Sequence, residues 1–104
     1  MKIAITSTGN TPDSNLDTHF GRCSYFVFYD TESRDYEFAE NSNRNADGKA
    51  GGMAVDFIVS RNIEKVVSGI FGVKVKSLLN DAGIQMITFQ KKITIREIIS
   101  LLNH

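Results

Sequence analysis

The sequence has a single cysteine, a single proline and no tryptophan. One cysteine cannot form a disulfide within the chain, which is typical of a protein that works in a reducing compartment. No apolar run approaches the roughly 18 residues that a membrane-spanning helix needs. Polar residues interrupt the N-terminal apolar segment too early for a signal peptide. We therefore expect a cytoplasmic protein that has no membrane partner.

An excess of charge of one sign is also missing, because twelve acidic residues balance twelve basic residues. Domains that bind nucleic acid usually carry a basic excess, so we expect no nucleic-acid partner. The length of 104 residues predicts one domain over 1–104, large enough to fold around its own core without a metal or a disulfide.

Short apolar runs rich in β-branched and aromatic residues predict five strands. Apolar residues at intervals of three and four predict three helices. The expected strands are 2–6, 25–29, 36–40, 64–68 and 84–89, and the expected helices are 52–61, a segment between Gly72 and Gly83, and a segment that begins at Thr94. Thr94 and Glu97 have the spacing of a capping box, and Gly83 is expected to end the second helix.

The resulting order, β-β-β-α-β-α-β-α, predicts an α/β fold with a mixed five-stranded sheet and helices on both faces. The first three strands are expected to form an antiparallel meander and the later ones to be parallel. Four loops, 7–22, 41–52, 69–72 and 90–93, then leave the sheet at the same end. Open α/β sheets bind ligands at the carboxyl ends of their parallel strands, so we expect the binding site there.

The first of these loops contains His19 and ends just before the only cysteine, Cys23, which follows the histidine by four residues. Thiolate and imidazole are ligands for soft and borderline metals, and Arg22 is expected to favour the thiolate form of the cysteine. His19 and Cys23 are therefore candidate metal ligands, although two ligands do not complete a zinc site. The residues leave a second interpretation open, in which Cys23 packs in the core and His19 orders its loop.

The second long loop ends in a glycine-rich turn, Gly48 to Gly52, that leads into a helix. Small residues let the backbone approach a ligand closely, and helix N-terminal amides attract anions. Together with the neighbouring loops, this turn predicts a shallow pocket for a bulky anionic ligand, and Met53 adds a weak thioether donor. The spacing matches no nucleotide-binding fingerprint, and a flexible connection before the helix is the alternative interpretation.

Two enzyme classes can be tested against the residues. Ribonuclease H-like nucleases need an acidic metal ligand on the first strand, and 2–6 has none. A thiol enzyme with Cys23 as nucleophile, His19 as base and Asp17 orienting it needs a lowered pKa at the cysteine. We expect no catalysis.

Four segments carry a resemblance to a known family: Asp17-Thr18-His19-Phe20-Gly21-Arg22-Cys23, the turn at 48–52, Val67-Ser68-Gly69 and Ala82-Gly83-Ile84. Over essentially the whole chain, the sequence resembles the dinitrogenase iron–molybdenum cofactor biosynthesis domain. The resemblance implies a ribonuclease H-like fold. It also implies a nitrogenase accessory role, in which a non-catalytic carrier protein binds a metal–sulfur cluster or an iron–molybdenum cofactor precursor.

The resemblance further implies a set of binding residues, namely His19, Phe20, Gly21 and Arg22, with Gly51, Gly52 and Met53 opposite them, and His19 and Cys23 as the candidates for contact with metal. The ligand would be an iron–sulfur or molybdenum-containing cluster, exchanged with cluster-assembly or acceptor proteins. Phe20 is expected to anchor the loop in the core, and Gly21 to supply a backbone angle that other residues avoid. The alternative is a regulatory or protein-interaction module that binds a small anion or nucleotide at the same sheet end. The oligomeric state is left open.

Overall fold

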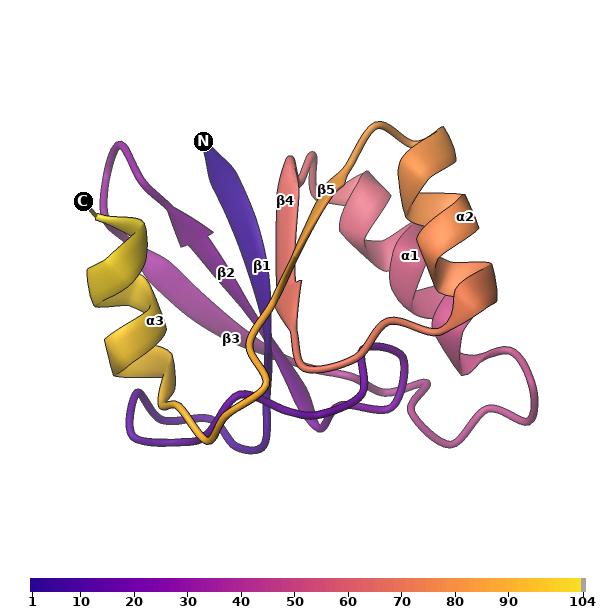
Figure 1. Cartoon of the computed structure of the whole chain (residues 1–104), viewed down its shortest axis with the longest axis horizontal. Coiled ribbons are helices and arrows are strands. Elements are labelled where there is room, and N and C mark those ends of the chain that lie inside the picture. Colours follow the sequence, from indigo (N-terminus) through magenta and orange to yellow (C-terminus); the bar gives the residue numbers. More distant parts are fainter. Residues whose placement is uncertain (104) are drawn as a thin grey trace.

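A computed structural model describes residues 1–103 of the chain (Figure 1). Its elements follow the predicted order: β1 (Lys2–Ser7), β2 (Tyr25–Asp30), β3 (Tyr36–Glu40), α1 (Ala50–Ser60), β4 (Lys65–Ser68), α2 (Val73–Asp81), β5 (Gln85–Thr88) and α3 (Ile95–Leu102). The predicted number, type and order of helices and strands are therefore confirmed.

The five strands form one mixed sheet in the order β3-β2-β1-β4-β5. β1 pairs with β2 and β2 with β3 in antiparallel register, whereas β1 pairs with β4 and β4 with β5 in parallel. β1 and β2 are buried over most of their length because the sheet is covered on both faces, and β3, at one edge, is largely exposed.

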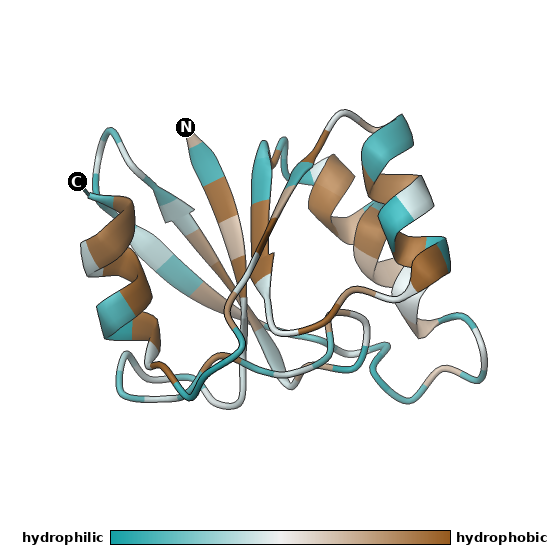
Figure 2. Cartoon of the chain, in the orientation of Figure 1, coloured by the Kyte–Doolittle hydropathy of each residue, from teal (hydrophilic) through white to brown (hydrophobic). Residues whose placement is uncertain are grey.

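The helices divide between the two faces of the sheet, as predicted. α1 and α2 lie on one face, where Ile58 and Leu79 join a cluster of aromatic and aliphatic side chains. α3 covers the opposite face through Ile95 and Ile98, which pack on Ile5 and its neighbours. Figure 2 shows these apolar bands in brown on both helical layers, and the loops below the sheet mostly in teal and white.

Two helix-end signals in the sequence are confirmed. Thr94 accepts a hydrogen bond from the amide of Glu97, and the Glu97 carboxylate accepts one from the amide of Thr94, which completes the capping box of α3. Gly83 follows α2 with a φ of 73°, the left-handed conformation that glycine adopts most easily after a helix. By contrast, α1 begins at Ala50, two residues before the predicted start at Gly52.

The strand directions place the four predicted loops at one end of the sheet, which is the lower end in Figure 1. The N-termini of the three helices lie at that same end, because each helix follows a strand that runs towards it. Among residues 1–103, none of the helices has the length and apolar character needed to cross a membrane.

Candidate functional site

The loop after β1 is held against the exit of β4 by backbone hydrogen bonds. The amide of Gly69 donates to the Asp17 carbonyl at 3.2 Å, and the amide of Phe20 donates to the Ile70 carbonyl at 3.2 Å. A side chain at position 69 would place its Cβ 2.9 Å from the Thr18 backbone, so only glycine allows this approach. The segment that carries His19 is thus attached to the carboxyl end of a central strand.

Two buried hydroxyl groups at the ends of β1 and β4 strengthen the same attachment. The Oγ1 of Thr6, at the end of β1, donates to the Asp17 carbonyl at 3.1 Å and lies 2.9 Å from the Oγ of Ser68, at the end of β4. Both side chains are fully buried. Because buried hydroxyl groups need partners, this pair ties β1, β4 and the loop together at the loop end of the sheet.

The 19–23 segment also packs directly on the glycine-rich start of α1. A Cβ placed on Gly21 would lie 2.7 Å from the Cα of Gly51, and a Cβ on Gly51 would lie 2.8 Å from Val75 of α2. The two glycines therefore allow backbone to approach backbone, and α1 to approach α2. The expectation that Gly21 serves an unusual backbone angle is wrong, since the positive-φ glycines among the described residues are Gly48 and Gly83.

Phe20 anchors the segment in the core, as expected. Its side chain is 1% exposed. Its ring lies 5.9 Å from that of Phe26 and 5.7 Å from that of Phe71. Burial of a phenylalanine contributes about 2–3 kcal/mol, enough to fix the position of a short loop. In this structure Phe20 stabilises the site and presents no surface to a ligand.

Cys23 is completely buried and belongs to the core cluster on the α1 side. Burial, together with the nearby Asp17 carboxylate, raises the pKa of its thiol from 9.0 to about 12. The expectation that Arg22 favours the thiolate is wrong, because the Arg22 guanidinium instead donates to the Arg44 carbonyl at 2.8 Å. A thiol enzyme needs the opposite pKa shift, so this environment argues against that interpretation. Cys23 takes the core-packing role that the sequence left open.

Asn41 is a residue that sequence reasoning missed. Its side chain is 4% exposed, and its Nδ2 group donates to the carbonyls of Gly21 and Cys23, each at 3.0 Å. The same Nδ2 lies 3.7 Å from the Cys23 sulfur. An asparagine at the end of a strand reads as a turn residue, so only the folded loop shows that Asn41 shapes the 19–23 segment.

His19, Arg22 and Met53 remain accessible at this end. His19 and Arg22 are exposed, and Met53 in the first turn of α1 is 39% exposed. Lys49, at the N-cap of α1, makes no side-chain capping hydrogen bond. Its side chain therefore leaves the first amides of α1 without a cap. Within residues 1–103, no group of three or more His, Cys, Asp or Glu side chains is placed to hold a metal ion.

A crevice of about 410 Å³ opens at the same end, on the other side of the 17–18 segment. It lies where the chain leaves β4 at Gly69 and Ile70 and leaves β5 at Phe89. Its wall carries polar and basic groups that the sequence reasoning did not single out: Thr8, Asn15, Gln90, Lys91 and Lys92. The strand order places the loops 7–22 and 90–93, which carry these residues, at this end of the sheet. That placement was the available signal in the sequence for these five residues.

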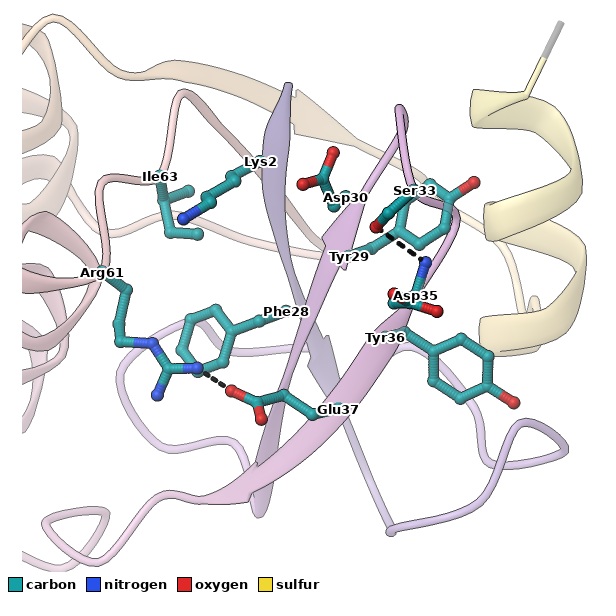
Figure 3. Close-up of a pocket in the computed structure, with 10 residues that line it drawn as sticks. All are labelled: Lys2, Phe28, Tyr29, Asp30, Ser33, Asp35, Tyr36, Glu37, Arg61 and Ile63. Atoms are coloured by element: carbon teal, nitrogen blue, oxygen red, sulfur yellow. Dashed lines mark hydrogen bonds and ion pairs between the residues drawn. The ribbon is translucent and has the colours of Figure 1, made fainter.

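A second cavity, of about 320 Å³, opens at the opposite end of the sheet (Figure 3). There the Arg61 guanidinium pairs with Glu37 and lies 4.3 Å above the ring of Phe28. The carboxylate of Asp30 accepts a hydrogen bond from the Glu32 amide at 2.9 Å. Two of the charged side chains that line this cavity, Arg61 and Glu37, are therefore already paired with each other.

A comparison with known families matches residues 1–104 to the dinitrogenase iron-molybdenum cofactor family. The chain belongs to this family. The resemblance drawn from the His19–Cys23 segment and the glycine-rich turns is therefore confirmed, and it extends over the whole sequence.

Two solved structures of other proteins are similar to this fold. The apo form of the orange protein from Desulfovibrio gigas is 25% identical, with a TM-score of 0.90 over 97% of this chain and 85% of that one. A NifB-like protein from Thermotoga is 32% identical, with a TM-score of 0.83 over the same shares. An uncharacterised Methanocaldococcus jannaschii protein is 28% identical over 89 residues, 83% of this chain and 72% of that protein.

Proposed function

We propose that this protein binds and carries a metal–sulfur cluster, or a precursor of the iron–molybdenum cofactor, without catalysing a reaction. The observation that carries the proposal is the contact of Gly21 with Gly51, which sets the family segment 19–23 against the uncapped start of α1. Family membership and the orange protein, whose apo form was solved, support a ligand of this kind.

The chemistry of the accessible groups fits an anionic, sulfide-rich cargo. The exposed imidazole of His19 is a ligand for iron or molybdenum, and the thioether of Met53 is a weaker one. Arg22 offsets negative charge, and the first amides of α1, including that of Gly52, donate to sulfide. Because no group of three or more His, Cys, Asp or Glu side chains within residues 1–103 is placed to hold a metal ion, we propose that the cargo is held at few points, which suits a protein that must release it.

Cys23 enters this proposal as a packing residue in the closed loop. Its sulfur becomes a ligand only when the loop around Asn41 opens, because the thiol is fully buried otherwise. Phe20 and Gly21 then act by holding His19 and Arg22 in place. We further propose cluster-assembly and acceptor proteins as partners, a cytoplasmic location, and a ribonuclease H-like relationship for the fold.

The test is anaerobic loading of the apo-protein with ferrous iron, molybdate and sulfide, followed by desalting. We expect visible absorption to stay with the protein, along with bound metal and sulfide. The His19→Ala variant should lose most of the uptake, and Cys23→Ala should keep it. If the wild-type protein takes up no metal and sulfide, the carrier proposal fails; if Cys23→Ala alone loses uptake, the thiol and not the imidazole is the principal ligand.

A further inference from the structure

We propose that the crevice between the ends of β4 and β5 is a binding site for a small oxyanion with two negative charges. Inorganic phosphate and the phosphate group of a monoester share this chemistry. The site lies at the same end of the sheet as His19, Arg22 and Met53, but it uses different residues and does not depend on the proposed cluster cargo.

The chain connections place the crevice at the switch point of the sheet. After β4 the chain turns to α2 on one face, and after β5 it crosses the end of the sheet to α3 on the other face (Figure 1). Loops that diverge from neighbouring parallel strands leave a gap between them, and open α/β sheets bind ligands in such gaps.

The two diverging loops are fixed, so the gap is a permanent feature of the fold. The 69–70 turn is bonded to Asp17 and Thr18 through backbone hydrogen bonds. The loop after β5 is bonded to the first loop through the Leu16 amide, which donates to the Ile93 carbonyl at 2.8 Å. The volume of about 410 Å³ lies within the range of small-molecule sites.

The charge of the wall selects an anion. Lys91 and Lys92 line the crevice, and neither forms an ion pair within the described part of the chain. The only acidic residue in the lining is Asp17, whose carboxylate accepts a hydrogen bond from the Ser24 amide at 3.3 Å. Glu97, which lies near Lys91, accepts hydrogen bonds from Thr94 instead.

Neutral donors complete the set. The hydroxyl groups of Thr8 and Thr18 and the side-chain amides of Asn15 and Gln90 are in the lining with the lysines. Two flexible ammonium groups with several hydroxyl and amide donors match a compact oxyanion, which accepts hydrogen bonds on all sides. Because lysine acts as a point charge, an anion with two charges should bind better than one with a single charge.

The experiment is a backbone amide NMR titration of the full chain at constant ionic strength. The probes are inorganic phosphate, sulfate, AMP and nitrate. We expect saturable shifts at residues 15–18, 69–70 and 89–92, with phosphate and sulfate binding more tightly than nitrate. Tighter binding of AMP than of phosphate would identify a monoester as the source of the phosphate group, and equal or weaker binding would identify the free ion.

Charge-matched variants test the lysines. Lys91→Gln/Lys92→Gln should weaken phosphate binding by about tenfold or more, since each lost charge-assisted hydrogen bond contributes to affinity. Lys65→Gln/Lys76→Gln removes the same charge outside the crevice and should leave the affinity unchanged. Unsaturable shifts, shifts centred elsewhere, or equal losses in both double variants would overturn the proposal.

The titration also separates this site from the cluster site. His19→Ala should keep its affinity for phosphate even though it loses cluster uptake, because His19 is not in the lining of the crevice. A wild-type protein that binds phosphate but takes up no cluster would refute the proposed function alone. A protein that takes up the cluster but shows no saturable phosphate binding would refute this inference alone.

Discussion

At the scale of single residues, the loop end of the sheet depends on glycines in close contact with their neighbours. Gly21, Gly51 and Gly69 each approach backbone or side-chain atoms that a Cβ would overlap, whereas Gly52 has open space around its Cα. The glycine-rich turn is therefore not uniform, because one glycine allows close packing and its neighbour leaves room at the surface.

Alanine substitutions should separate these two roles. Gly21→Ala should lower the free energy of unfolding by about 1–3 kcal/mol, because the new methyl group overlaps the Gly51 backbone and displaces the 19–23 segment. Gly52→Ala should raise it by about 0.5–1 kcal/mol, since alanine favours the helix and meets no neighbouring atom. Urea unfolding of both variants measures the difference; a Gly21→Ala protein as stable as the wild type would contradict the tight contact.

The buried thiol should make stability depend on pH in the alkaline range. The pKa of Cys23 is about 12 in the folded protein and 9.0 is its ordinary value. Below pH 9 the thiol is neutral in both states. Between pH 9 and 12 it ionises only after unfolding, so the folded state loses stability as pH rises, by about 1.4 kcal/mol per pH unit.

Urea unfolding of the wild type and of Cys23→Ala between pH 8 and pH 10.5 checks this dependence. The stability of the variant should fall less steeply above about pH 9, because the ionisable thiol is gone. Parallel curves for the two proteins would mean that the thiol is accessible to water in the folded state.

At the scale of elements, α3 both covers one face of the sheet and ends the loop that lines the crevice. The loop 89–94 crosses the end of the sheet and is followed at once by the capping box of Thr94 and Glu97. The start of α3 is therefore the fixed point from which Lys91 and Lys92 extend.

Removing the cap should loosen this fixed point. Thr94→Ala should lower the free energy of unfolding by about 1 kcal/mol, because the Glu97 amide loses its acceptor at the helix start. Ser100→Ala on the exposed side of α3 is the control and should change stability by less than about 0.5 kcal/mol. Thermal or urea unfolding distinguishes the two variants, and equal stabilities would show that the capping box contributes nothing.

The elements were also the most predictable part of the sequence. Apolar spacing and turn residues act locally, so the order of strands and helices, the cap at Thr94 and the stop at Gly83 could be predicted. The start of α1 was predicted two residues late. Glycine disfavours helix, but Gly51 lies within α1 here, where a Cβ would lie too close to Val75 of α2.

The site was less predictable, because its residues depend on contacts between distant segments. Strand order alone predicted that the 19–23 segment would meet the start of α1. A ligand cysteine and a packing cysteine look alike in sequence, so the burial of Cys23 under Asn41 was not predictable. The crevice at Lys91 and Lys92 depends on which face each helix covers, and local patterns do not carry that information.

At the scale of the whole molecule, the two ends of the sheet carry different groups although the net charge is balanced. One end of the sheet holds the four loops, the uncapped start of α1 and the lysine-lined crevice. The other end holds the cavity in which Arg61 and Glu37 neutralise each other. The sheet between these two ends packs against one core cluster on each of its faces.

The chain also enters and leaves the fold at the end away from the loops. β1 begins at Lys2 and α3 ends at Leu102, both on the upper side in Figure 1, while the His19 segment lies below. A reporter protein or an affinity tag joined at either terminus would therefore point away from the loop end of the sheet. The same geometry lets a domain of this kind be fused to larger proteins in either order while the loop end of the sheet stays open to solvent.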